Sequence, residues 1–306
     1  MFVGHISIDK IENINGIQTQ PGGAALYAAL AARTLFPNVA LISATGKDYP
    51  FFGFLELLPY KDVKIFDVPS TRFHIKYDRR LEAHYLKTEH GAGSRITSRR
   101  ISDQYLKHKS MFHISPMNPS KVARILDRIK LKSPETKVSV NTWIDYIARG
   151  RKDRRILNEV ALKADFFIVS DSEAKALAQT DSISSAVRQL KAKRLIVTLG
   201  NFGAIISGKD VEIQMVPALN LEPDKVIDTT GAGDVWCGAF LATYNLTEDF
   251  SKSVSAASII SRIKCSDWGF RSLVNLRFKE PNDVIEFVMG LKDGGIQKKI
   301  FEYIKD

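Results

Sequence analysis

The stretch Asp228-Thr229-Thr230-Gly231-Ala232-Gly233-Asp234 runs directly into the apolar run Val235-Trp236-Cys237-Gly238-Ala239-Phe240-Leu241. Two glycines ahead of an apolar helix permit backbone angles that other residues rarely adopt, so consecutive N–H groups can converge. Convergent amides at a helix N-terminus bind anions through unpaired donors and the helix dipole. Asp234 adds a carboxylate that can take the proton of an attacking hydroxyl. The stretch therefore has two parts that phosphoryl transfer needs, although a helix capped by Asp234 explains the same residues equally well.

Outward from this stretch, short β-type runs alternate with helical runs, which favours an α/β fold with a mainly parallel sheet. The expected strands are residues 2–8, 39–44, 110–114, 137–141, 165–170, 194–199, 204–207 and 211–216. The expected helices are residues 24–35, 51–58, 120–131, 151–163, 172–178, 230–244 and 250–264. We expect all of them to form a single domain over residues 1–306.

Residues 64–98 differ from the rest of the chain. Three consecutive alternating runs, 65–68, 71–77 and 82–87, follow one another with no helix between them. Consecutive strands without helices are typical of an antiparallel insertion. Together with the polar excursion at 9–20, this region predicts a lid beside the main sheet.

Composition excludes several classes of protein. The 306 residues are 44% hydrophobic and 25% charged, which is ordinary for a globular chain. The net charge is +10, but the densest basic run, 149–155, has no interleaved aromatic residues. A solvated face, or a patch that steers phosphorylated metabolites, is favoured over a nucleic-acid site. No run approaches the roughly 20 apolar residues of a membrane span, and the first residues do not resemble a signal peptide, so we expect a cytoplasmic protein.

The seven residues 228–234 resemble the second signature of the ribokinase-like (PfkB) carbohydrate kinase family. The resemblance implies a ribokinase-like three-layer α/β/α fold with a mainly parallel central sheet and a small antiparallel β lid. It also implies that Asp234 is the catalytic base and that the amides of Gly231, Ala232 and Gly233 form an anion hole.

Two earlier segments match the substrate side of that family. Gly22-Gly23 at a helix start is similar to the first signature, which lies against the substrate. Gly4 and Asp9, with the strand between them, resemble the family's opening strand, whose terminal Asp commonly binds substrate hydroxyls. Taken alone, the glycines indicate only a helix-entry turn and Asp9 a solvated turn residue.

Two later segments match the nucleotide side. Residues 197–203 look like the family's Thr-x-Gly-x-x-Gly segment, which implies that Thr198, Gly200 and Gly203 border ATP. The helix around Ser258 is the expected wall of the adenine pocket.

The sequence departs from the family at two positions. The family's Asn-x-x-Glu near the metal reads Ser170-Asp171-Ser172-Glu173 here. Glu173 can orient Mg²⁺-bound waters, or it can be an ordinary first-turn residue that the helix dipole favours. Tyr27 stands where ribokinases tend to have Asn. It offers a ring face and one hydroxyl to a substrate, or it is a core aromatic.

The sequence thus predicts an ATP- and Mg²⁺-dependent kinase that phosphorylates a hydroxyl of a sugar, polyol or nucleoside. Asp9, Gly22, Gly23 and Tyr27 are expected at the substrate. The resemblance further implies a homodimer through the lid, and we expect no nucleic-acid or membrane partner. The alternative is a catalytically weak ligand-binding or nucleic-acid-binding regulatory protein on the same fold, which the Ser170 departure motivates.

Overall fold

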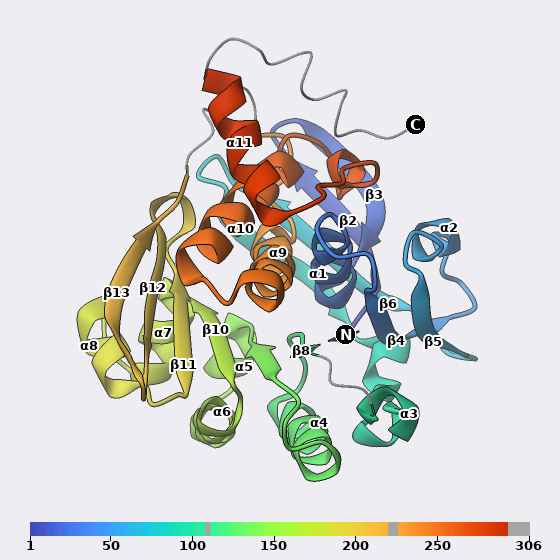
Figure 1. Ribbon diagram of the computed structural model, residues 1–306. Coiled ribbons are helices and arrows are strands. Elements are labelled where there is room, and N and C mark those ends of the chain that lie inside the picture. The colour runs from blue at the N-terminus through green and yellow to red at the C-terminus, as the bar shows by residue number, and fades with distance from the viewer. Residues whose placement is uncertain (108–110, 220–225, 293–306) are drawn as a thin grey trace. The chain divides into compact units, whose positions relative to one another are not determined.

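The computed structural model describes residues 1–107, 111–219 and 226–292 (Figure 1). Contacts within the chain divide it into two compact units. The first unit comprises Met1–Gly4 and Ile96–Pro217, and the second comprises His5–Arg95 and the residues from Ala218 on. None of the helices in the described ranges is long and apolar enough to cross a membrane.

The first unit is built on a mostly parallel run of strands. Their order is β13-β12-β11-β10-β9-β8-β1, and the pairs from β1 to β11 are parallel whereas β11-β12 and β12-β13 are antiparallel. The strands are β1 (Phe2–Val3), β8 (Phe112–Ile114), β9 (Val138–Asn141), β10 (Phe166–Ser170), β11 (Arg194–Thr198), β12 (Gly203–Gly208) and β13 (Val211–Pro217). The central strands β9 and β10 are almost wholly buried, as strands covered on both faces must be.

Helices of the first unit connect these strands. They are α3 (Asp103–Leu106), α4 (Pro119–Lys132), α5 (Ile144–Ala148), α6 (Arg151–Lys163), α7 (Asp171–Ala178) and α8 (Ile183–Gln189). α4 shows why they form where they do: Asn118 caps its first turn, Pro119 occupies the first helical position, and Val122, Ile125 and Ile129 are buried on one face. The sequence did not indicate α5 and α8, because both are short.

The second unit contains a small sheet in the order β3-β2-β6-β7. Its strands are β2 (Ser7–Asn13), β3 (Gly16–Gly22), β6 (Thr71–Tyr77) and β7 (Ala83–Glu89), and two of the three pairs are antiparallel. β2 and β6 pair in parallel. Ile11, Ile75 and Tyr77 form the buried apolar cluster of this sheet, with Phe73 and Trp268 packed against it.

The remaining elements of the second unit include three helices that lie side by side, α1, α9 and α10, in which α9 packs against both others (Figure 1). The elements are α1 (Ala24–Arg33), β4 (Ala40–Gly46), α2 (Phe52–Leu55), β5 (Tyr60–Phe66), α9 (Ala232–Thr247), α10 (Phe250–Lys264) and α11 (Pro281–Lys292). A Cβ at Gly238 would come within 2.0 Å of the Ala28 carbonyl oxygen, so glycine is what permits α9 to approach α1 so closely. This close packing fixes the start of α9 beside α1.

Two expectations from the sequence are wrong. The apolar run 2–8 is two strands of different sheets, β1 and β2. The strand expected at 65–68 is β5, which pairs in parallel with β4, so the small sheet resumes only at Thr71. The polar stretch 9–20, expected beside residues 64–98, lies in the β2–β3 hairpin of that small sheet, where the Asn15 amide donates to Asn13 Oδ1 at the turn.

Candidate active site

Gly231 and its neighbours start helix α9 with a turn that only glycine fits. Gly231 precedes the first helical residue with φ 72°, and a Cβ there would lie 2.4 Å from the ring of Tyr27. The Ala232 amide donates to the Thr229 carbonyl at 3.1 Å, so this one of the three predicted amides already closes the turn. Among the described residues, no acceptor pairs with the amides of Gly231 and Gly233. No atom outside its own turn of helix lies within 4 Å of the position of a Cβ at Gly233, which leaves open space beside that residue.

Asp228, at the start of the same stretch, is fully buried and holds the turn together. Its Oδ1 accepts the Thr230 amide at 2.8 Å. Its Oδ2 accepts Gln20 Nε2 and the Gly269 amide, both at 2.9 Å. Asp228 therefore links β3, the 228–230 turn and the loop after α10, which is a structural role that the sequence did not reveal.

A buried lysine neutralises this carboxylate. Lys264 Nζ donates to the Asp228 carbonyl oxygen at 2.6 Å and lies 3.3 Å from its Oδ2, and neither side chain is exposed to solvent. Burial raises the pKa of Asp228. The Lys264 ammonium and the hydrogen bonds from Gln20 and Thr230 lower this pKa by more than burial raises it, so the net shift is downward. The carboxylate is thus ionised across the neutral range.

Asp9 carries a second buried carboxylate, in the middle of β2. It is 2% exposed, and Ser7 Oγ donates to its Oδ1 at 2.6 Å. Burial raises the pKa of Asp9 to about 7, the Ser7 hydrogen bond partly opposes this, and the charges of Asp228 and Asp234 raise it further. Asp9 and Asp234 therefore lie within electrostatic reach of each other, so the structure brings together these two predicted residues. Asp9 is a buried strand residue and not a solvated turn residue.

Gly22 and Gly23 are required by the close approach of β2. A Cβ at Gly22 would lie 1.8 Å from Asp9 Oδ2. Gly23 has φ 101°, and a Cβ there would lie 2.4 Å from the His5 carbonyl oxygen. These contacts account for both glycines structurally, and their contact with substrate stays a prediction.

Tyr27 has the surroundings of a core aromatic. It is 1% exposed, its hydroxyl accepts a hydrogen bond from Gln20 Nε2 at 3.3 Å, and its ring meets Phe270 edge-on at 5.5 Å. Lys264 Nζ lies 5.6 Å from the ring centroid, within cation–π range. Tyr27 thus packs against Gly231 and against the Lys264 side of the buried ion pair. Its contact with substrate stays a prediction.

In the first unit, Ser170 and Glu173 form a complete capping box. Ser170 Oγ accepts the Glu173 amide at 3.2 Å, and Glu173 Oε2 accepts the Ser170 amide at 2.8 Å. Ser170 is thus the N-cap of α7, a role that Ser fills as well as Asn does. The cap accounts for Glu173 without a metal, so metal binding is left as a prediction.

The predicted nucleotide-side segments of the first unit meet at one sheet edge. Thr198 ends β11 directly opposite Ser170 at the end of the parallel strand β10. Gly200 (φ 57°) and Gly203 (φ 111°) then turn the chain back into β12. Ligands of parallel α/β sheets bind outside such carboxyl ends.

Ser258 belongs to the second unit, on α10. Its hydroxyl donates to the Val254 carbonyl at 2.8 Å and accepts from Trp236 Nε1 at 3.4 Å. Helix packing therefore explains its hydroxyl, and its contact with adenine stays a prediction.

Comparison with known proteins agrees with this fold. The chain matches the pfkB family carbohydrate kinase over residues 2–275. The cytidine kinase of Thermococcus kodakarensis is 28% identical over 278 residues, which cover 88% of this chain and 96% of the relative.

Two solved structures share the fold. The nucleoside kinase of Burkholderia thailandensis in complex with inosine has a TM-score of 0.73 at 19% identity, covering 94% of this chain and 98% of that one. The ribokinase of Giardia lamblia has a TM-score of 0.77 at 18% identity, covering 95% and 98%. The fold is therefore that of the ribokinase-like kinases. The chain belongs to the pfkB family of carbohydrate kinases, and it is a kinase.

Proposed function

We propose that the protein transfers the γ-phosphoryl group of ATP to a hydroxyl of a nucleoside or sugar. The observation that carries this proposal is the start of α9. There, the amides of Gly231 and Gly233 have no partner among the described residues, open space lies beside Gly233, and Asp234 follows in the same helical turn.

Asp234 acts as the general base in this proposal. It accepts the proton of the attacking hydroxyl as the oxygen–phosphorus bond forms. The amides of Gly231 and Gly233, with the dipole of α9, stabilise the charge on the transferred phosphoryl oxygens. Asp9 orients the substrate, because an ionised carboxylate accepts hydrogen bonds from hydroxyls, and its pKa of about 7 keeps it partly ionised at neutral pH.

Thr198, Gly200 and Gly203 border the nucleotide in this proposal. Mg²⁺, when bound with ATP, neutralises charge on the phosphates. Glu173 fits a water-mediated contact better than direct coordination, because the capping box commits its Oε2 to the Ser170 amide.

Nucleosides are the first substrates to test. The relative from Thermococcus kodakarensis is named a cytidine kinase, and the Burkholderia thailandensis structure holds inosine. A ribokinase of Lactococcus lactis is 27% identical over 289 residues, so free ribose belongs in the same panel.

The test is ATP consumption with nucleosides, sugars and polyols, run with wild type and Asp234→Asn. Loss of the base predicts a kcat lower by about 10²- to 10⁴-fold with little change in stability. Asp153→Asn is the matched control, because Asp153 also stands third in its helix, α6. Near-normal turnover by Asp234→Asn contradicts the base. No turnover on any substrate, with salt-dependent RNA or DNA binding, favours the regulatory alternative.

We also propose that two copies associate through the small sheet. Ile14 (72% exposed), Ile17 (65%) and Leu86 (54%) lie on its β2–β3 hairpin and β7. Association of two copies would remove these exposed apolar side chains from water. Sedimentation should show a dimer that Ile17→Lys dissociates, and a monomeric wild type at micromolar concentration contradicts the interface.

A further inference from the structure

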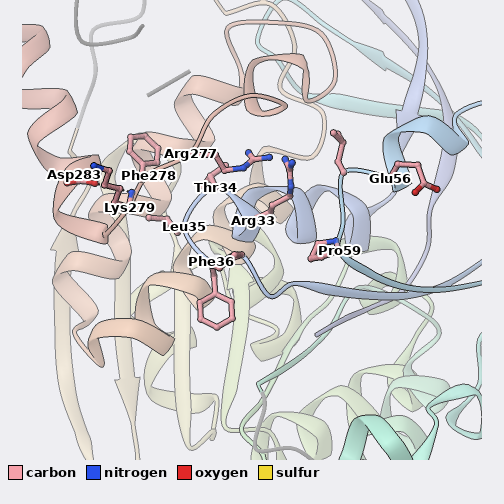
Figure 2. Close-up of a pocket in the computed structure, with 12 residues that line it drawn as sticks. Arg33, Thr34, Leu35, Phe36, Glu56, Pro59, Arg277, Phe278, Lys279 and Asp283 are labelled. Atoms are coloured by element: carbon pink, nitrogen blue, oxygen red, sulfur yellow. Dashed lines mark hydrogen bonds between the residues drawn. The ribbon is translucent and has the colours of Figure 1, made fainter. Parts of the chain in front are cut away.

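A pocket of about 820 Å³ lies in the second unit at the C-terminal end of α1 (Figure 2). Three segments enclose it: residues 33–37, residues 56–59 and the loop that leads into α11. The Phe278 amide donates to the Thr34 carbonyl at 2.7 Å and fastens the loop to the end of α1. The pocket volume is that of a small-molecule site.

Three cations line this pocket without an acidic partner. In the described residues, no carboxylate lies within 4.0 Å of the charged nitrogens of Arg33, Arg277 or Lys279. Figure 2 shows the guanidinium ends of Arg33 and Arg277 directed toward each other. Two like charges that face each other repel, and an anion between them removes the repulsion.

The two carboxylates of the lining are already engaged elsewhere. Glu56 Oε2 pairs with Lys61 Nζ at 2.7 Å. Asp283 Oδ2 accepts the backbone amides of Lys279 at 3.0 Å and of Glu280 at 3.2 Å, which caps the start of α11. The pocket therefore presents net positive charge that its own acids do not neutralise.

Both arginines keep most of their donors for a ligand. Arg33 gives one N–H to the Val274 carbonyl at 3.1 Å, and Arg277 gives one to the Leu276 carbonyl. A guanidinium has five N–H donors, so four remain on each. The single hydrogen bond to a backbone carbonyl also restrains each arginine side chain, so that the remaining N–H groups of its planar guanidinium can make bidentate contact with phosphate oxygens.

The other walls are apolar, with Leu35, Phe36, Leu57 and Phe278 among them. We propose that this pocket binds a small organic phosphate, whose anion lies between Arg33 and Arg277 and whose apolar or ring-bearing body packs on Phe36 and Phe278. The site is separate from the proposed catalytic turn. Gly23 begins α1 at the Asp9 end, and ten helical residues place Arg33 about 15 Å away.

The experiment is calorimetric titration with 1-naphthyl phosphate at constant ionic strength. Arg33→Gln and Arg277→Gln should each weaken binding about tenfold or more, because each removes charge-assisted hydrogen bonds. Arg271→Gln is the matched control: it removes the same charge six residues from Arg277 but outside the lining. Gly233→Ala tests whether the probe is bound at the catalytic turn instead. Both controls should keep the wild-type affinity within about twofold, and circular dichroism checks that every variant is folded.

Four results overturn the proposal. The first is the absence of binding by the wild-type protein at millimolar probe. The second is wild-type affinity in both pocket variants, or an equal loss in Arg271→Gln, which indicates unspecific attraction to the basic surface. The third is loss of binding in Gly233→Ala. 1-Naphthol, which has the ring body without the phosphate, should bind far more weakly, and equal binding of 1-naphthol also contradicts an anion site.

Discussion

Replacing Lys264 by Met tests the buried ion pair beneath the catalytic turn. Methionine has nearly the length of the lysine stem but no charge, so the Asp228 carboxylate keeps its burial and loses its cation. Breaking a buried pair by removing one partner costs about 3–5 kcal/mol, a large fraction of the roughly 5–15 kcal/mol that stabilises a domain. With a urea m-value of about 3 kcal/mol/M, the unfolding midpoint should fall by roughly 1 to 1.7 M.

The pH dependence of this loss distinguishes charge from packing. The folded pKa of Asp228 lies below the ordinary aspartate value of 3.8, so in wild type this group contributes stability above that value and loses it as pH falls through the folded pKa. Without Lys264, burial dominates and raises the pKa of Asp228. The variant carboxylate then takes up a proton as pH falls from 7 toward 4, and the stability deficit should shrink over that window.

Urea titrations at pH 7 and pH 4.5, followed by circular dichroism, measure both effects. The double variant Lys264→Met/Asp228→Asn removes both charges and should recover part of the loss, since the two sites are coupled. Lys252→Met, on the same helix but half-exposed, should change stability by less than about 0.5 kcal/mol. If Lys264→Met loses less than about 1 kcal/mol of unfolding free energy, or loses the same amount at both pH values, the Lys264–Asp228 ion pair does not stabilise the fold as proposed.

Gly233→Ala should leave the melting temperature unchanged or slightly raised while it lowers kcat/KM at least about tenfold, because its methyl group enters the open space beside the amides. Gly231→Ala should instead lower stability by about 2 kcal/mol or more through its left-handed backbone and the Tyr27 ring; the opposite ranking in thermal melts contradicts the turn geometry. The unfolding free energy of wild type should fall as pH rises from 4 to 8, because the unfolded chain ionises Asp9 near its ordinary pKa whereas the folded pKa is about 7. Asp9→Asn lacks this loss, so its stability relative to wild type should rise over that window by up to about 2–4 kcal/mol. An equal stability difference at pH 5 and pH 8 contradicts this shift. Glu173→Gln should keep the cap of α7, since Gln also completes a capping box, but its activity should require several-fold more Mg²⁺. Glu173→Ala should in addition lower the stability of the protein by about 1 kcal/mol. If Glu173→Gln has the Mg²⁺ dependence of wild type, the residue is only a helix cap.

Local patterns predicted the parts of the fold that depend on neighbouring residues. The strands β9 to β13 and the helices α1, α4, α6, α9 and α10 all lie within a few residues of their expected positions. Each has either an uninterrupted apolar run or an apolar face, together with a start or stop signal such as Gly231 or Pro119. The glycine turn at 231–234 was likewise predicted as a helix start, because its signal is contained in seven consecutive residues.

Features that depend on distant residues could not be predicted in this way. Lys264 ends a helix in which basic residues are expected on the surface, and only the fold shows that it is wholly buried against Asp228. Gln20 reaches Asp228 across 208 positions of the chain. The parallel pairing of β5 with β4 depends on register between separate strands, and the sequence of either strand alone contains no signal for its partner.

The buried carboxylates of the second unit separate structural from functional charge. Asp228 has a cation and three hydrogen-bond donors, and its pKa is lowered, so its charge is satisfied within the fold. Asp9 is as deeply buried but has a single hydrogen-bond donor among the described residues, Ser7, and a raised pKa of about 7. A fold that maximised stability would not keep such a carboxylate, because every pH unit between 3.8 and 7 adds to the cost of its charge. A substrate hydroxyl that donates a hydrogen bond to Asp9 would stabilise its buried charge, and this stabilisation would add to the free energy of substrate binding. We therefore expect Asp9, and not the better-paired Asp228, to be the carboxylate that recognises the substrate.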